Sequence, residues 1–226
     1  MTWTIPNILT TLRLLAAPGV VLLFLYFTRP WADWFALVLF VGAAVTDWFD
    51  GYLARLWKQE SKFGAMLDPI ADKAMVVIAL LLIAGLSGVN RPDGMDPWIL
   101  LPATVIIFRE VFVSGLREFL GDTAGLLKVT KLAKWKTTAQ MIAIGILFGT
   151  GIFEHMLIER TVGMDAAMIS EIAAGGPDPL NLRLIGMAAS VTWWLGVALL
   201  WIAAFLTLIT GFDYFRKSLP YLRDEA

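Results

Sequence analysis

Six long hydrophobic stretches dominate this chain, and each approaches the roughly 20 residues that a helix needs to cross a bilayer. With 58% hydrophobic and only 16% charged residues, the chain has too little polar surface to cover a soluble globule of its size. We therefore expect an all-α integral membrane bundle of six transmembrane helices. The expected spans are Ile8–Phe27, Trp31–Tyr52, Asp68–Val89, Trp98–Phe119, Lys134–Phe153 and Leu184–Thr210.

Nothing in the sequence divides the chain into parts, because it has no internal repeat, low-complexity tract or linker. We expect a single membrane domain over residues 1–226. The longest connection, from Glu154 to Arg183, is acidic and is expected on the outer side. The net charge of -1 excludes a generally basic nucleic-acid-binding protein. The absence of cysteine excludes disulfides, thiolate metal sites and a cysteine nucleophile.

The basic residues set the orientation, because loops rich in lysine and arginine are retained in the cytoplasm. When the spans alternate sides, only Arg29, Arg91, Arg160 and Arg183 fall on one side. The other side collects Arg13, Arg55, Lys58, Lys62, Lys73, Arg109, Arg117, Lys128, Lys131, Lys134, Lys136, Arg216, Lys217 and Arg223. We expect both termini in the cytoplasm.

Four carboxylates lie between Thr46 and Lys73, at the ends of two hydrophobic spans. The pairs are separated by three and by four residues, so on helices each pair shares one face. Like charges this close repel unless a cation neutralises them, and hard oxygen ligands without nearby His or Cys suit Mg²⁺ or Mn²⁺. The sequence therefore predicts a divalent metal site at Asp47, Asp50, Asp68 and Asp72.

The residues between these pairs suit a phosphate site. Gly51 and Ala54 allow close backbone approach, Arg55 can grip phosphate oxygens through its planar fork, and Gly64 permits a tight turn. The alternative is a solvated loop in which the acids pair only with neighbouring cations. Those cations would be Arg55, Lys58, Lys62 and Lys73. Acids gathered on two helical faces beside a membrane favour the functional site.

The spacing of Asp47, Asp50, Gly51, Ala54, Arg55, Gly64, Asp68 and Asp72 resembles the complete signature of the CDP-alcohol phosphotransferase family. This resemblance implies a six-helix membrane fold, usually homodimeric, and CMP as the leaving group. It implies that the first three aspartates are metal ligands. It also implies that Asp72 is both a metal ligand and the general base.

Two further stretches, WTIPNILTTLRLLAAP from Trp3 and FREVFVSGLREFLGDTAGLLKVTKLAKWKTTAQM from Phe108, resemble the family members that use glycerol 3-phosphate as acceptor. The resemblance implies transfer of a phosphatidyl group from CDP-diacylglycerol to glycerol 3-phosphate in phospholipid biosynthesis. The donor's acyl chains would lie in membrane lipid.

Four polar residues are candidates for contact with CDP-diacylglycerol. Asn7, Thr10 and Arg13 sit at the cytoplasmic start of the first span, where they could line a nucleotide pocket. Helix capping and snorkelling are the structural alternatives. Ser61, between Arg55 and Gly64, could also touch the nucleotide, although a lone loop serine is more often only solvated.

Recognition of the acceptor needs positive charge, because the phosphate group of glycerol 3-phosphate is a dianion. The candidates are Arg109, Arg117, Lys128, Lys131, Lys134 and Lys136, of which we select Arg109, Arg117 and Lys134. Arg109 lies in an apolar run where an unpaired charge is expensive, so pairing with Glu110 or Glu118 is its alternative. Lys128 and Lys131 also fit a basic loop attracted to anionic lipid.

Two other functions remain open. A phosphatidylserine, phosphatidylinositol phosphate or cardiolipin synthase of the same family would differ only in its acceptor. A divalent-cation transporter could also place aspartates on facing helices, but its acids would be expected near mid-membrane, with an exit path to both sides.

Overall fold

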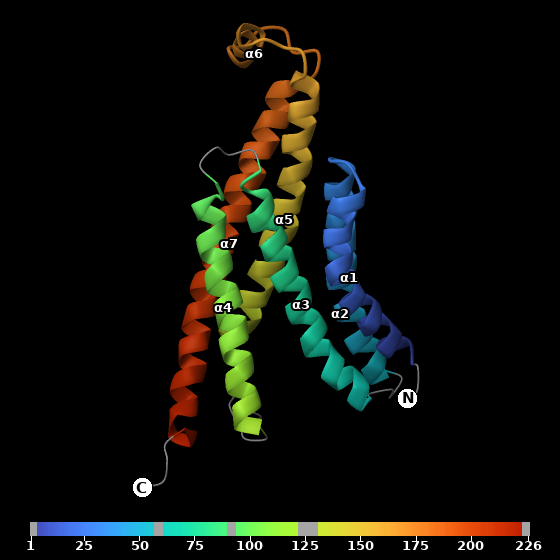
Figure 1. Ribbon diagram of the computed structural model, residues 1–226, viewed down its shortest axis with the longest axis vertical. Helices are drawn as coiled ribbons and strands as arrows, with labels where there is room; N and C mark the ends of the chain where they lie inside the picture. Colours follow the sequence, from blue (N-terminus) through green and yellow to red (C-terminus); the bar gives the residue numbers. More distant parts are fainter. Residues whose placement is uncertain (1–3, 57–60, 90–93, 122–130, 223–226) are drawn as a thin grey trace. The chain divides into compact units, whose positions relative to one another are not determined.

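The computed structural model describes residues 4–56, 61–89, 94–121 and 131–222, and within them it leaves out the side chains of residues 48–55, 131, 133 and 134. Helices without any strand make up this part of the chain (Figure 1). In order they are α1 (Ile5–Tyr26), α2 (Trp31–Leu56), α3 (Lys62–Leu86), α4 (Pro97–Leu120), α5 (Lys131–Thr161), α6 (Ala166–Ala173), α7 (Leu182–Ser218) and the 3-10 turn η2 (Leu219–Tyr221).

Five helical stretches in the described part of the chain are long and apolar enough to cross a membrane. They are Ile5–Tyr26, Lys62–Ser87, Pro97–Leu120, Trp135–Thr161 and Leu182–Tyr221. These five agree with the expected all-α membrane bundle. The remaining expected span coincides with α2, a helix of 26 residues that is not among the five. The count of six spans therefore stays a prediction.

Several helices extend beyond the expected spans, because the rule of about 20 residues measures the hydrocarbon thickness and not the length of a helix. Helix α3 begins at Lys62, so Asp68 lies inside the helix and not at its start. Helix α5 continues to Thr161, where a connection had been expected from Glu154 onwards. The short helix α6 within that connection was not predicted.

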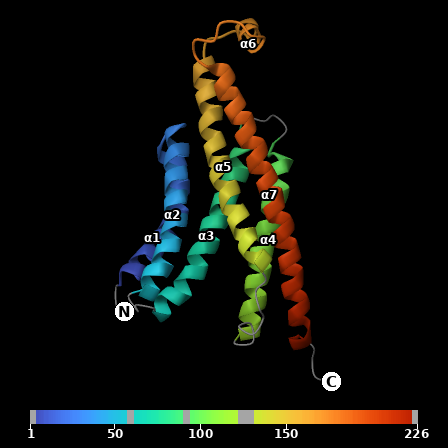
Figure 2. The ribbon, with the colours of Figure 1, turned by 180° about the vertical axis from the view of Figure 1, so that it is seen from behind.

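The chain divides into two compact units, and each is described by itself. The first comprises Met1–Ala79 and Ile144–Gly196. In this unit α1 packs along α2, as both views show (Figures 1 and 2). Three aromatic rings fill part of the core: the centroid of Phe148 lies 5.9 Å from that of Phe40 and 6.5 Å from that of Phe24.

The second unit comprises Leu80–Ala143 and Val197–Ala226. Here α4 and the second half of α7 lie side by side in both views (Figures 1 and 2). Near the start of α4 the indole N–H of Trp201 donates to the carbonyl oxygen of Trp98 at 3.0 Å. Further along the helices, the rings of Phe112 and Phe215 lie 5.7 Å apart. These contacts join the two helices over several turns.

Carboxylates mark the starts of the later helices by accepting hydrogen bonds from otherwise free backbone N–H groups. Asp96 accepts from Trp98 at 2.9 Å to begin α4. Asp178 accepts from the N–H groups of Leu182 at 2.7 Å and Arg183 at 3.0 Å at the start of α7. These hydrogen bonds, above all that from Arg183, lower the pKa of Asp178 from its ordinary value.

Candidate active site

Three polar side chains of α1 lie on one face of the helix, because Asn7, Thr10 and Arg13 follow one another at intervals of three. All three are buried. The hydroxyl of Thr10 donates to Oδ1 of Asp68 on α3 at 2.8 Å. Helix capping does not explain these side chains, because the N-cap of α1 is Thr4. The face instead contacts the segment that carries the predicted metal ligands.

The guanidinium of Arg13 joins three of the four signature aspartates. It forms ion pairs with Asp47 of α2, with Oδ1 of Asp68 at 3.3 Å and with Oδ1 of Asp72 at 3.2 Å. The Arg13 side chain is only 2% exposed, whereas the three aspartate side chains are 48%, 46% and 54% exposed. Arg13 therefore does not snorkel toward the headgroups. It supplies positive charge behind carboxylates that remain accessible.

A second polar contact ties α1 to the start of α3. The Ser61 hydroxyl donates to Oδ1 of Asn7 at 2.7 Å and accepts from the Gly64 N–H at 3.0 Å. A Cβ at position 64 would lie 2.9 Å from Oδ1 of Asn7, so any side chain there would displace Asn7. Gly64 therefore serves close packing within a helix and not the tight turn expected from the sequence. Ser61 is a partner of Asn7 and not merely a solvated loop residue.

Four predicted site residues lie on the stretch of α2 whose side chains are outside the described residues. The helix itself is continuous through Asp50, Gly51, Ala54 and Arg55. Their roles as metal ligand and donor contacts stay predictions.

The acidic residues have the right chemistry for a divalent metal, although they do not form a finished site. No three acidic side chains within the described ranges lie close enough to hold one ion directly. Asp47, Asp68 and Asp72 nevertheless all contact one cation, the guanidinium of Arg13. These contacts bring one carboxylate of α2 and two of α3 to the same guanidinium. An all-oxygen donor set fits Mg²⁺ or Mn²⁺.

The second unit contains a separate buried cluster of charge. Oε1 of Glu110 pairs with Nη1 of Arg109 at 3.2 Å and with Nζ of Lys136, which comes from α5. The pairing of Arg109 with Glu110, one of the two alternatives drawn from the sequence, is therefore confirmed. Glu118 is exposed and does not join this cluster.

The basic residues chosen from the sequence as acceptor ligands differ in their exposure and contacts in the structure. Arg117 is exposed on α4, and the side chain of Lys134 lies outside the described residues. Sequence reasoning passed over Lys136 in favour of Lys134, yet Lys136 is the buried cation beside Glu110. A usable signal was the spacing of Lys136 and Gln140, which lie one helical turn apart and are both buried.

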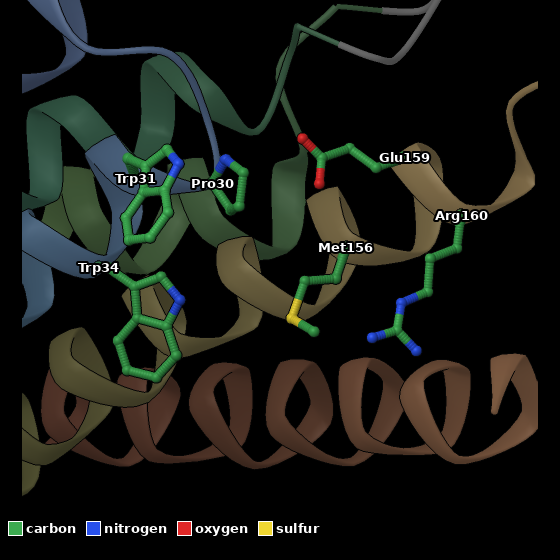
Figure 3. A pocket seen from close by; sticks show the side chains of 6 residues that line it. All are labelled: Pro30, Trp31, Trp34, Met156, Glu159 and Arg160. Atoms are coloured by element: carbon green, nitrogen blue, oxygen red, sulfur yellow. The ribbon is translucent and has the colours of Figure 1, made fainter. Parts of the chain in front are cut away.

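One pocket of the first unit lies away from the aspartates. It has a volume of about 240 Å³ and is lined by Pro30, Trp31, Trp34, Met156, Glu159 and Arg160 (Figure 3). Trp34 and Asp47 are both on α2, and their separation in sequence corresponds to about 20 Å along the helix axis. The pocket therefore does not belong to the aspartate site.

Comparisons with known proteins identify the family of the chain. A relative from Cereibacter sphaeroides (strain ATCC 17023), named CDP-diacylglycerol--glycerol-3-phosphate 3-phosphatidyltransferase, is 68% identical over 100% of both chains. Relatives with the same name from Rickettsia bellii and Escherichia coli K12 are 36% and 42% identical, over 96% and 65% of this chain and 96% and 78% of their own. The model of the CDP-alcohol phosphatidyltransferase family matches residues 3–172, a range that includes every signature residue. The chain belongs to the CDP-alcohol phosphatidyltransferase family.

Proposed function

We propose that this chain transfers the phosphatidyl group of CDP-diacylglycerol to glycerol 3-phosphate, producing phosphatidylglycerol phosphate and CMP for phospholipid biosynthesis. The observation that carries the proposal is the 68% identity, over the whole of both chains, to a relative named for this reaction. The gathering of Asn7, Thr10, Arg13, Asp47, Asp68 and Asp72 supports it from the structure.

The donor would bind where α1 meets the start of α3. The polar group formed by Asn7, Ser61 and Gly64 can hydrogen-bond a nucleotide. Gly51, Ala54 and Arg55 would lie near its diphosphate, while the acyl chains remain in lipid. Thr10 and Arg13 orient the carboxylates that face the diphosphate.

In the reaction, the acceptor hydroxyl oxygen forms a bond to the phosphorus that bears the diacylglycerol. The bond from that phosphorus to the CMP oxygen breaks, and CMP leaves with the electron pair. Asp72 accepts the hydroxyl proton, and its half-exposed carboxylate is accessible for this role. Asp47, Asp50, Asp68 and Asp72 would hold Mg²⁺ or Mn²⁺. The bound metal would neutralise charge on the diphosphate and the transferring phosphorus.

The phosphate of the acceptor needs cations that the donor does not occupy. Lys136 is buried and Arg109 is partly buried, and both pair with Glu110. The Arg109 Nε is itself buried and has no hydrogen-bond partner in the described part of the chain. A guanidinium with a spare donor suits a phosphate oxygen. We propose Arg109 and Lys136 as acceptor-phosphate ligands and retain Arg117 and Lys134 as candidates.

The apolar helices make this an integral membrane protein. We propose a homodimer in the bacterial inner membrane, with six spans that include α2 and with both termini and the active site cytoplasmic. The uneven distribution of basic residues supports this orientation. An alternating topology places the start of α1, the end of α2 and the start of α3 on the same side of the membrane. The contacts of Arg13 with Asp47 and Asp68 are consistent with that topology.

The test is CMP release by purified protein given CDP-diacylglycerol, Mg²⁺ or Mn²⁺, and one acceptor at a time. Glycerol 3-phosphate should support CMP release with matching formation of phosphatidylglycerol phosphate. L-serine, inositol 1-phosphate and phosphatidylglycerol should give no more than the acceptor-free rate. Product from any of these three, with none from glycerol 3-phosphate, would refute the acceptor assignment but leave the family assignment intact.

A further inference from the structure

We propose that Glu110 is a positioning residue for the acceptor, whose carboxylate holds Arg109 and Lys136 at the spacing at which both can bind one phosphate. This inference rests on the proposed function, because it assumes that glycerol 3-phosphate is the acceptor. Glu110 itself does not touch the substrate and acts through its two partners.

The geometry shows that the pairing with Arg109 is not a default of helix structure. Consecutive residues of a helix diverge by about 100° and do not face each other. Arg109 reaches Oε1 of Glu110 because its side chain lies along α4, packed against α7. At Gly211 of α7, a Cβ would lie 2.9 Å from Cγ of Arg109, so the absence of a side chain there makes room for the arginine. The aliphatic part of the Arg109 side chain thus packs against α7, while its guanidinium pairs with Glu110.

Lys136 approaches the same oxygen from a different helix. Its Nζ pairs with Oε1 of Glu110, the atom that also accepts from Arg109. One carboxylate oxygen therefore links a cation of α4 to a cation of α5. The Ser114 hydroxyl donates to the backbone carbonyl of Glu110 at 2.5 Å, one turn further along α4. Glu110 takes part in all three of these contacts.

The charges explain why a carboxylate is needed in a site for an anion. The side chains of Arg109, Glu110 and Lys136 are only 15%, 12% and 8% exposed. Two cations this buried would repel each other and separate if no anion lay between them. Among these three residues, Glu110 compensates one of the two positive charges. The Arg109 Nε, buried and without an acceptor within the described ranges, is available to a phosphate.

A purely structural ion pair would give the same contacts, so the test must separate recognition from folding. Glu110→Gln should raise the KM for glycerol 3-phosphate on the order of tenfold, because each cation then loses its ion pair and keeps at most a weaker hydrogen bond to a neutral oxygen. The kcat and the KM for CDP-diacylglycerol should stay within about twofold of wild type. Glu110→Asp keeps the charge but shortens the reach, so its KM should lie between those of wild type and Glu110→Gln.

Glu118→Gln is the matched control, because it makes the same change at an exposed position of the same helix. It should leave the KM for glycerol 3-phosphate unchanged. If Glu110→Gln does not fold in detergent, Glu110→Asp carries the test alone and must show a raised KM in folded protein. An unchanged or lowered KM for glycerol 3-phosphate in the folded Glu110 variants would overturn the inference. A lowered KM is the result expected if the carboxylate only repels the acceptor, because the variants remove or weaken that repulsion.

A double-mutant cycle with Lys136→Met tests whether Glu110 acts through its partner. If it does, the increase in KM of the double variant should be smaller than the product of the two single increases. A full product would mean that the two residues act independently, and would also overturn the inference. If Lys136→Met and Arg109→Lys leave this KM unchanged, the proposed acceptor site itself fails. If they raise it and Glu110→Gln does not, only the role of Glu110 fails.

Discussion

Gly64→Ala should weaken binding of CDP-diacylglycerol without unfolding the protein. The added Cβ would lie 2.9 Å from Oδ1 of Asn7 and 3.3 Å from Oγ of Ser61. Both atoms belong to the hydrogen-bonded group that we propose as the nucleotide contact, and Asn7 is buried. The collision can be relieved only if Asn7 moves and its 2.7 Å hydrogen bond with Ser61 lengthens or breaks.

The magnitude follows from two opposing contributions. Overpacking by one carbon in a close-packed site costs about 1–3 kcal/mol. Replacing glycine by alanine inside a helix returns about 1 kcal/mol through helix propensity. The free energy of unfolding should therefore fall by no more than about 2 kcal/mol. The KM for CDP-diacylglycerol should rise roughly 5- to 150-fold if the full cost falls on donor binding, because 1.4 kcal/mol corresponds to about tenfold.

The assay is initial rate against CDP-diacylglycerol concentration in mixed micelles, with melting temperature measured on the same preparation. Gly85→Ala is the control, because Gly85 lies on the same helix and a Cβ there would meet nothing within 4 Å. This variant should match or exceed wild type in stability and have an unchanged KM. If Gly64→Ala behaves like Gly85→Ala, the Asn7–Ser61–Gly64 group does not contact the donor.

Three further predictions concern other parts of the molecule. Asp68→Asn should lower turnover by about a hundredfold or more while the protein stays folded. Excess chelator should abolish the activity of the wild-type protein, and full turnover in chelator would rule out the metal. Gly151→Ala should lower the free energy of unfolding by roughly 1–2 kcal/mol, because its Cβ would collide with the buried carboxylate of Asp33 at an overpacking cost of up to about 3 kcal/mol, of which helix propensity in α5 returns about 1 kcal/mol; a wild-type melting temperature would contradict this. Asp178→Ala should lower the melting temperature at pH 7. Because the folded pKa of Asp178 is lowered, chiefly by the N–H of Arg183, its stabilisation is present above the ordinary value of 3.8 and is lost as the pH falls through the folded pKa. The difference from wild type should therefore shrink in acid, and a constant difference would argue against this origin.

The helices were predictable wherever the bilayer sets their length. An apolar stretch of about 20 residues has few alternatives to a spanning helix, because every backbone polar group must be satisfied within it. The eight-residue helix α6 escaped this rule because it is too short to span. Its cap, Asp165, which accepts from the N–H of Met168 at 2.7 Å, was a local signal that a hydropathy reading ignores.

The candidate site was predictable in its residue types but not in its contacts. Helical periodicity places Asp68 and Asp72 on one face whatever the rest of the chain does. The pairing of Arg13 with Asp47, 34 positions later, depends on how α1 packs against α2, which no local pattern encodes. The same holds for Lys136, since its contact with Glu110 depends on which face of α5 turns toward α4.

We propose that the carboxylates of α2 and α3 form a divalent metal site behind which Arg13 lies. The most direct measurement is an anomalous difference map from crystals grown with Mn²⁺ and CDP-diacylglycerol. We predict a manganese peak about 2.1 Å from carboxylate oxygens of Asp47, Asp68 and Asp72, with the Arg13 guanidinium withdrawn from at least one of them. A map in which the donor is bound, Arg13 still contacts all three aspartates and no manganese lies beside them would contradict the claim.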